Sequence, residues 1–224
     1  MSARDVIVST GCALATCFAL YASHLYLTRD DVDYDEWRKR EMKKRGIDRL
    51  NIHKSLFFGI QTRSCDIHET GTLRCDDLEC KYGPMSYIAN LIDDAKETLD
   101  MAIYIMTAEI IGQAVIAAHQ RGVVVRIICD TEMSFSPQSS VRELKSLGMQ
   151  VRRKMSPYIM HHKFMIVDGE IVSSGSMNFT MTALLGNWEN VVVSSSPDLV
   201  DQFVAGFEKL WEEFGNYSRT EDDV

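Results

Sequence analysis

Two hydrophobic patterns alternate along the chain from residue 83 to residue 214. Apolar residues at helical spacing, such as Ile88, Leu91, Ile92 and Ala95, predict helices, and short runs rich in Val and Ile predict buried strands. The predicted helices are 83–97, 108–121, 137–147 and 197–214, and the predicted strands are 55–60, 99–106, 123–129, 149–155, 164–167, a return strand from 171, and 187–194. Strands that alternate with helices indicate an α/β fold, with a mainly parallel or mixed β-sheet flanked by helices.

A β-hairpin is predicted where the apolar run 164–167 meets the return strand that starts at residue 171. Asp168 followed by Gly169 is a strong signal for a tight turn, because both residue types tolerate the positive φ angles that such turns require. The chain is therefore expected to reverse at these two residues and to carry its flanking segments side by side.

Four polar side chains flank this hairpin in two equally spaced pairs. His161 and Lys163 are two positions apart, so on a strand their side chains point to the same face, and Ser176 and Asn178 repeat that spacing. Phosphoryl transfer needs a nucleophile, a proton for the leaving oxygen, and groups that hold the other phosphate oxygens. A hydrogen-bonded hairpin without chemistry is the alternative for any single pair, but the whole set on two predicted strands favours phosphate chemistry.

The same residues form a longer motif. The motif consists of His161, Lys163 and Asp168, followed by Gly175, Ser176 and Asn178. It resembles the HKD signature of the phospholipase D superfamily, and the resemblance covers most of residues 83–214. It implies a phospholipase D-like sandwich in which these polar residues are catalytic, with Asp168 fixing the hairpin turn. Glu189 stands where the family often has a carboxylate, which would orient His161.

Members of this superfamily need two such motifs per active site, and this chain has one. The resemblance therefore implies a homodimer with a composite active site at a twofold axis. One His161 would attack phosphorus to form a phosphohistidine, while the partner's His161 would protonate the leaving oxygen and then deprotonate water. This mechanism needs no catalytic metal and no 2′-hydroxyl, so it predicts cleavage of DNA as well as RNA, with a 5′-phosphate product. A catalytically inactive monomer is the alternative.

Three of the six cysteines lie in one short segment together with a histidine, as Cys65, His68, Cys75 and Cys80. Three thiolates and an imidazole suit a closed tetrahedral zinc site, which would be structural because no position is left open for water. An odd number of clustered cysteines also favours metal binding in a reducing compartment over a disulfide framework. A loop that contains these residues by chance is the alternative, because their spacing is not that of a standard zinc finger.

The N-terminal region predicts a membrane anchor. Residues 6–27 contain no Asp, Glu, Lys or Arg, and a helix of that length would extend about 33 Å, enough to span a bilayer. We therefore predict a transmembrane anchor over 1–28, with a cleaved signal peptide as the alternative. Basic clusters at 38–40 and 43–45 indicate that the rest of the chain faces the cytosol. Such an anchor is compatible with the mitochondrial outer membrane, and its sequence does not distinguish that membrane from the endoplasmic reticulum.

The rest of the chain is predicted to contain a charged juxtamembrane helix over 29–50, a catalytic domain over 51–216 with its zinc-binding insertion at 65–80, and an acidic tail over 217–224. An N-terminal anchor combined with a Cys/His insertion resembles the Zucchini or mitochondrial phospholipase D branch of animals. That resemblance implies an enzyme held at the mitochondrial surface.

Charge bears on the substrate. A net charge of −8 gives no overall attraction for nucleic acid, so such binding needs a local basic patch. Arg152, Arg153 and Lys154 precede the HKD motif on a predicted strand, and they could line a groove that follows phosphates. An edge strand protected by charge is the alternative.

Two enzymatic functions remain, and both act on phosphodiesters. The resemblance implies an endonuclease on single-stranded RNA, with single-stranded DNA as a further substrate, that acts in piRNA production. It also implies a phospholipase that hydrolyses cardiolipin to phosphatidic acid. A nuclease needs a narrow basic channel and a lipase needs an apolar pocket, so the basic segment 152–154 favours the nuclease. A membrane-tethered scaffold that binds RNA without cutting it is the non-enzymatic alternative.

Overall fold

The structure is a computed structural model that describes residues 52–60, 64–65 and 74–215. The chain divides into two compact units, Met1–Asp48 and Arg49–Val224, and every described residue belongs to the second. The predicted anchor, the juxtamembrane helix and the acidic tail lie outside the described residues. Within the described ranges, no helix combines the length and the apolar character needed to cross a bilayer.

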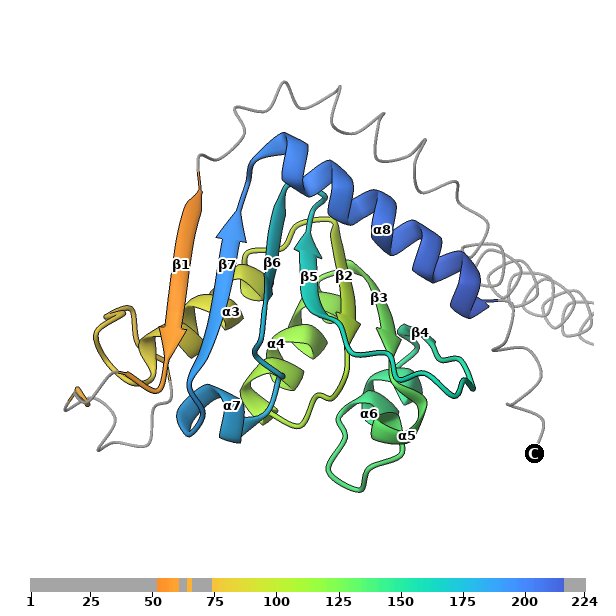
Figure 1. Ribbon diagram of the computed structural model, residues 1–224, viewed down its shortest axis with the longest axis horizontal. Coiled ribbons are helices and arrows are strands. Elements are labelled where there is room, and N and C mark those ends of the chain that lie inside the picture. Colours follow the sequence, from red (N-terminus) through yellow and green to blue (C-terminus); the bar gives the residue numbers. More distant parts are fainter. Residues whose placement is uncertain (1–51, 61–63, 66–73, 216–224) are drawn as a thin grey trace, which may run out of the picture. The chain divides into compact units, whose positions relative to one another are not determined.

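A seven-stranded mixed sheet forms the centre of the described unit, in the order β1-β7-β6-β5-β2-β3-β4 (Figure 1). The strands are β1 (His53–Phe58), β2 (Thr98–Ile103), β3 (Val124–Cys129), β4 (Gln150–Arg152), β5 (Lys163–Val167), β6 (Ile171–Gly175) and β7 (Glu189–Ser194). Strands β2, β3 and β4 run parallel, and all other neighbours are antiparallel. The parallel part comes from the alternating segments between residues 98 and 152, where a helical crossover joins each pair of strands.

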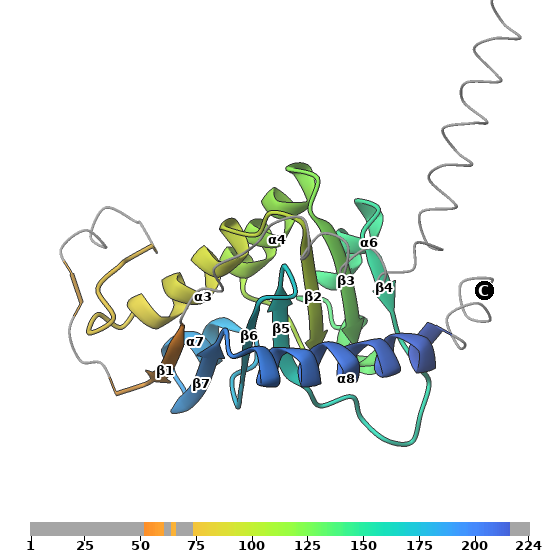
Figure 2. The same ribbon diagram turned by 90° about the horizontal axis from the view of Figure 1, so that it is seen from above.

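Helices cover both faces of the sheet: α8 lies along one face, and α3, α4 and α6 lie on the other (Figure 2). The helices are α3 (Gly83–Asp93), α4 (Glu109–Gln120), α5 (Thr131–Ser134), α6 (Val141–Ser146), α7 (Met181–Leu185) and α8 (Pro197–Gly215). Helix α8 buries residues three and four positions apart, namely Val200, Val204, Phe207, Trp211 and Phe214. That spacing places them in one stripe, which packs on the apolar side chains of β5 and β6. The predicted α/β sandwich with a mixed sheet is confirmed.

One charged residue interrupts the apolar face of the sheet beneath α8. Arg126 on β3 makes a two-pronged contact with Asp100 on β2, at 2.7 Å and 2.8 Å, and a 2.7 Å contact with Glu208 on α8. The side chains of Arg126 and Asp100 are only 5% and 1% exposed. The guanidinium also lies 4.9 Å from the Phe207 ring centroid and 5.3 Å from that of Trp211. Because each buried charge has an opposite partner, the cluster ties α8 to the sheet without an isolated charge in the core.

The hairpin forms where the sequence predicts it, and β5 pairs with β6 across a tight turn. Asp168 and Gly169 both have positive φ angles, 53° and 63°. Three residues, 168–170, separate the paired residues Val167 and Ile171, and the backbone N–H of Glu170 donates a 2.9 Å hydrogen bond to the Val167 oxygen. The two left-handed positions in this turn match the right-handed twist of the paired strands. Strand β5 therefore ends at Val167, and β6 returns along it.

Several elements differ from their predicted extents. The predicted strand 149–155 is reduced to β4, and the predicted helix 137–147 to α6. Two short helices, α5 and α7, were not predicted from the hydrophobic pattern. Each is stabilised locally, because the side chain of its N-cap residue, Asp130 or Thr180, accepts a hydrogen bond from a backbone N–H in the first turn. Helices of four and five residues are too short to produce a recognisable period.

Candidate active site

Strand ends bring most of the predicted catalytic residues to one end of the sheet, namely His161, Lys163, Ser176, Asn178 and Glu189, while Asp168 lies at the opposite end of β5. Lys163 at the start of β5 lies opposite Ile103 at the end of β2, and Gly175 at the end of β6 lies opposite Val191 near the start of β7. The first part of the HKD motif, His161 and Lys163, lies at the start of β5, and its last part, Ser176 and Asn178, directly follows β6. The antiparallel pairing of these two strands therefore brings both parts of the motif to the same end of the sheet.

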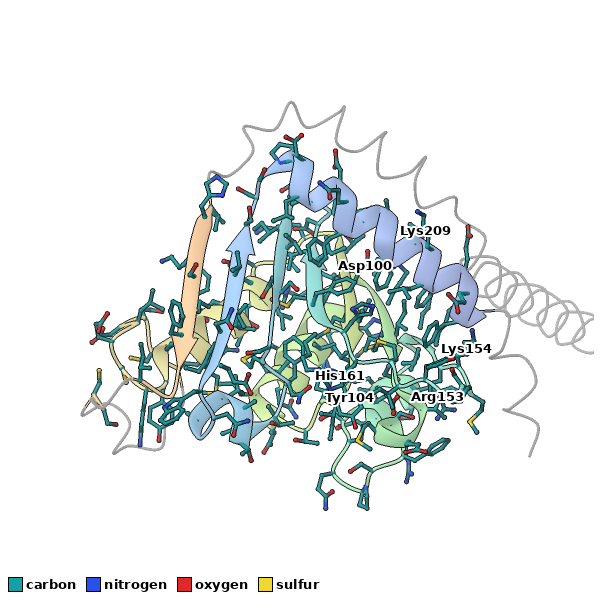
Figure 3. All side chains as sticks on the ribbon, viewed as in Figure 1. Asp100, Tyr104, Arg153, Lys154, His161 and Lys209 are labelled. Atoms are coloured by element: carbon teal, nitrogen blue, oxygen red, sulfur yellow. The ribbon has the colours of Figure 1, made fainter. Side chains whose placement is uncertain are left out.

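The Tyr104 ring contacts both His161 and Lys163, and Figure 3 shows Tyr104 and His161 next to each other. The His161 and Tyr104 ring centroids are 4.7 Å apart with the planes inclined by 62°, and the Lys163 Nζ lies 5.2 Å from the Tyr104 ring centroid. Lys163 also donates a 2.9 Å hydrogen bond from Nζ to the backbone oxygen of His161. His162 packs on Phe164, with 5.7 Å between ring centroids. The nucleophile candidate and the cation candidate therefore lie side by side.

Burial lowers the pKa of two neighbouring cationic groups, Lys163 and His162. Burial lowers the pKa of the Lys163 ammonium, and the negative charge of Glu189 opposes that change. Burial also lowers the pKa of His162, and the charges of Lys163 and His161 add to this effect, so His162 is neutral near pH 7. A cation that has lost part of its water attracts a phosphate oxygen more strongly than a fully hydrated cation does.

Ser176 and Glu189 are joined to each other. Ser176 donates a 2.5 Å hydrogen bond from Oγ to Glu189 Oε2, and the backbone N–H of Asn190 donates to the same Oγ at 3.1 Å. Asn187 donates from Nδ2 to the second Glu189 oxygen at 3.0 Å. Within the described residues, no hydrogen bond joins Glu189 to His161. In a single chain the carboxylate therefore orients the serine, and the predicted orientation of His161 by Glu189 stays a prediction.

Asn178 provides a polar atom without a partner. Its Oδ1 atom is buried and makes no hydrogen bond to any other described residue. An unsatisfied buried polar atom costs about 1–3 kcal/mol, and such atoms in native proteins call for an explanation such as a catalytic role or a missing partner. An amide carries both donor and acceptor atoms, so Asn178 suits a ligand that brings a polar group to this position.

The three basic residues before the motif all have partners within the chain. The Arg152 guanidinium lies 4.0 Å from the Trp211 ring centroid and donates to the backbone oxygen of that residue at 2.6 Å. Arg153 packs on the ring of Phe135 at 4.5 Å, and Lys154 forms a 2.6 Å ion pair with a glutamate of α8. The structure therefore places two of these residues at the end of α8, and only Arg153 against a loop beside the motif.

Two residues at the site were not singled out from the sequence. Tyr104 directly follows β2, and Asp130 directly follows β3. The Asp130 carboxylate accepts a 3.1 Å hydrogen bond from the backbone N–H of Met160, which holds the segment that leads into His161. Their position just after buried parallel strands is the available signal, because ligand-binding residues gather at the carboxyl ends of such strands.

Three thiols converge at the predicted zinc site. The Sγ atoms of Cys65, Cys75 and Cys80 all lie within 4.8 Å of one another. His68, the fourth predicted ligand, lies outside the described residues. Three soft donors that converge from two separated segments match the donor set that zinc prefers. The described residues therefore fit a structural zinc ion, and zinc itself stays a prediction.

The thiols influence one another's ionisation. Burial acts to raise the pKa of Cys80, but hydrogen bonds from the Tyr82 backbone and from Cys65 outweigh it and lower the pKa to about 7. Burial and the neighbouring thiols raise the pKa of Cys65 to about 12. One thiolate therefore forms readily and opposes the next, which is the situation that a bound cation relieves.

The comparisons with known proteins agree with this geometry. Residues 88–211 match the family described as "Cardiolipin synthase, PLD-like domain". The chain belongs to this phospholipase D-like family. The prediction drawn from the HKD motif is therefore confirmed at the level of the superfamily.

Several relatives of this chain bear the name mitochondrial cardiolipin hydrolase. The relative from Danio rerio is 32% identical over 187 residues, which cover 81% of each chain. The relative from Homo sapiens is 38% identical over 120 residues, covering 54% of this chain and 48% of that one. This chain spans 63% of the relative from Drosophila melanogaster, at 34% identity, and 65% of the relative from Chlamydomonas reinhardtii.

Solved structures support the fold. The crystal structure of a phospholipase D family member, Nuc from Salmonella typhimurium, is 26% identical and matches with a TM-score of 0.57 over 72% of this chain and 94% of that chain. NucT from Helicobacter pylori matches with a TM-score of 0.56 at 22% identity, over 72% of this chain and 97% of that one. Both matches cover nearly all of the other chain, so the described unit has the phospholipase D-like fold.

Proposed function

We propose that this chain is a phosphodiesterase of the phospholipase D type that uses His161 as its nucleophile. The observation that supports this most strongly is the pairing of an exposed imidazole with the partly buried Lys163 ammonium against one tyrosine ring. Ser176 and Asn178 follow β6 at the same end of the sheet and carry further polar groups. This set contains a nucleophile, a cation and neutral hydrogen-bonding groups, which are the components that phosphoryl transfer requires.

The proposed reaction has two steps. In the first, a ring nitrogen of His161 attacks phosphorus, a phosphohistidine bond forms, and the bond to the leaving oxygen breaks as that oxygen takes a proton from a second histidine. In the second, water gives its proton to the second histidine and its oxygen to phosphorus, which releases His161. Lys163 balances the charge on the nonbridging oxygens throughout. All the acid, base and nucleophile roles are assigned to protein side chains.

The second histidine is proposed to come from another copy of the chain. The sequence contains a single HKD motif, and the His162 ring packs on that of Phe164. A twofold axis beside His161 would bring the same residue from both copies together, since an isologous contact pairs a surface patch with itself. Sedimentation of the full chain is expected to show a dimer.

Cardiolipin is the substrate that the surface around the site favours. The residues just before His161 expose apolar side chains, since Met155, Tyr158 and Ile159 are 62%, 84% and 61% exposed. Exposed apolar and tyrosine side chains beside a phosphate site suit a lipid whose acyl chains lie in a membrane. The relatives named mitochondrial cardiolipin hydrolase support this substrate. The product would be phosphatidic acid, and the mitochondrial outer membrane is the proposed location, with the predicted anchor over 1–28 holding the enzyme there.

Single-stranded RNA is the second candidate, as an endonuclease reaction that leaves 5′-phosphate ends in piRNA production. It is favoured by the Zucchini resemblance of the anchor and the Cys/His insertion. Arg153 stacked on Phe135 also provides an exposed aromatic ring with a cation, which suits a nucleotide base and its phosphate. The remaining basic residues of this segment are paired within the chain, which weakens the original electrostatic argument for RNA.

One experiment separates these substrates. The full chain is incubated with cardiolipin vesicles, labelled single-stranded RNA and labelled single-stranded DNA, beside the His161→Asn variant. We expect acid-labile phosphoryl label on the parent protein and none on His161→Asn, whichever diester is cut. Turnover of lipid alone selects cardiolipin, and turnover of both nucleic acids selects the nuclease. Cleavage confined to RNA with a cyclic phosphate product would refute the mechanism.

A further inference from the structure

We infer that Tyr104 is a positioning residue of the proposed phosphodiesterase, whose ring holds His161 and Lys163 in the geometry that the reaction needs. The inference rests on the proposed function and adds to it a residue outside the HKD motif. Figure 3 shows Tyr104, which follows β2, and His161, which precedes β5, next to each other.

His161 lacks other means of orientation within the described part of the chain. Its ring is exposed, and its side chain makes no hydrogen bond to another described residue. The carboxylate expected to orient it, Glu189, is hydrogen-bonded to Ser176 and Asn187. The ring contact with Tyr104, at 4.7 Å between centroids, is therefore the interaction that restricts rotation of the imidazole.

The same tyrosine also places the cation. The Lys163 Nζ lies over the Tyr104 ring at 5.2 Å from its centroid, within the range in which an aromatic face attracts an ammonium group. The Lys163 Nζ also donates a hydrogen bond to the His161 backbone oxygen, so Tyr104, His161 and Lys163 all contact one another. A lysine without this contact would sample several rotamers, because its side chain has four rotatable bonds.

Tyr104 itself stands on a rigid support. The preceding residue, Ile103, is fully buried and pairs with Lys163 on one side and with Cys129 on the other. Two residues after Tyr104, Met106 forms an isolated parallel bridge with Phe179. The segment that carries the tyrosine is thus held by both parts of the catalytic motif, by β5 through Lys163 and by the residues after β6 through the bridge.

Phe179 directly follows Asn178, so the bridge has a consequence for the whole site. The backbone oxygen of Phe179 accepts 2.9 Å hydrogen bonds from the N–H groups of both Thr107 and Ala108. Displacement of the segment after β2 would therefore move Asn178 as well as the tyrosine ring. Tyr104 lies where the two parts of the motif are connected, although it belongs to neither.

The test compares two substitutions at position 104 on whichever diester the parent turns over. Tyr104→Leu removes the ring, and because small displacements of reacting groups can cost on the order of 100-fold in rate, we expect kcat to fall by about that factor with little change in KM. Tyr104→Phe keeps the ring and is expected to retain kcat within about threefold, since both contacts use the ring and not the hydroxyl. The urea midpoint of both variants should stay near that of the parent.

Tyr87→Leu is the matched control. It removes a similar contact between helix α3 and strand β1, in which the Lys54 Nζ lies 4.8 Å from the Tyr87 ring centroid. Its kcat should equal that of the parent. A second readout is the NMR signal of the His161 ring protons, which should shift in Tyr104→Leu through loss of the ring current and stay in place in Tyr104→Phe and Tyr87→Leu.

The possible results are distinguishable. An unchanged kcat and an unchanged His161 signal in Tyr104→Leu would overturn the inference. A kcat in Tyr104→Phe as low as in Tyr104→Leu would also overturn it, because the hydroxyl and not the ring would then be responsible. If the parent cleaves no phosphodiester and forms no phosphohistidine, the proposed function fails, and the positioning role fails with it.

Discussion

Asp168 belongs to the HKD motif but lies at the far end of β5 from His161. Strand β5 spans Lys163–Val167, so about 17 Å of extended chain separates Lys163 from Asp168, at about 3.4 Å per residue. A side chain at that distance cannot reach a phosphate held by Lys163. We therefore predict that substitutions of Asp168 reduce stability and leave catalysis by the folded protein intact.

The magnitude follows from the contacts of the carboxylate. Asp168 accepts hydrogen bonds from the backbone N–H groups of Lys96, Glu97 and Thr98, at 3.0 Å, 2.7 Å and 2.9 Å. Hydrogen bonds to charged groups contribute about 1.5–3 kcal/mol each, but the Lys96 contact is exposed and water can replace it. We expect Asp168→Gly to cost about 3–6 kcal/mol in the free energy of unfolding, because the Glu97 and Thr98 contacts are both lost.

The positive φ of 53° at this position separates the two causes of a loss. Glycine adopts this conformation without strain, so Asp168→Gly reports the lost contacts of the carboxylate together with the added entropy of the unfolded chain. Asp168→Ala should cost about 1–2 kcal/mol more, because a Cβ atom disfavours left-handed backbone. Asp168→Asn tolerates the turn and retains one acceptor oxygen, so it should cost least of the three.

Urea denaturation followed by circular dichroism measures the three free energies, and phosphodiester turnover per folded molecule measures activity. The expected order of destabilisation is alanine, then glycine, then asparagine, with kcat unchanged in all three. A loss of kcat beyond about tenfold in Asp168→Asn, with an unchanged urea midpoint, would refute the structural role, because such a difference corresponds to about 1.4 kcal/mol in the transition state.

Three further predictions concern other parts of the molecule. Arg126→Met leaves Asp100 buried without its partner and should lower the free energy of unfolding by about 3–5 kcal/mol; a urea midpoint equal to that of the parent would contradict this. A zinc chelator should lower the Tm of the full chain but not of Cys80→Ser, in which the site is already incomplete; equal effects on both would argue against a structural metal. Burial lowers the pKa of Lys163, so the charged form is lost, and activity falls, at a lower pH than for an ordinary lysine. Lys163→Arg, although less active, stays protonated and should lack that alkaline fall in kcat/KM; an identical pH profile would show that Lys163 does not titrate in the reaction.

Features that depend on neighbours in the sequence were predictable. Helix α8 shows its apolar stripe as a simple period, and Asp168 followed by Gly169 marks the turn of the hairpin. The alternation of strands and helices was enough for the fold class, and the HKD spacing for the superfamily. Each of these signals is carried by residues a few positions apart, where backbone geometry alone decides which side chains share a face.

Features that depend on residues far apart in the chain became visible only in the tertiary structure. The Asp168 carboxylate accepts hydrogen bonds from backbone N–H groups about 70 positions earlier in the chain. Arg152 packs on the Trp211 ring near the end of α8, instead of lining a groove with Arg153 and Lys154. Tyr104 carries no motif, and it meets His161 because β2 ends opposite the start of β5. Sheet order and register decide which strand ends become neighbours. The sequence by itself determined the candidate reactive groups and their local spacing. The pairing of β2 with β5 decided which side chains lie beside them, because packing between distant segments has no local period.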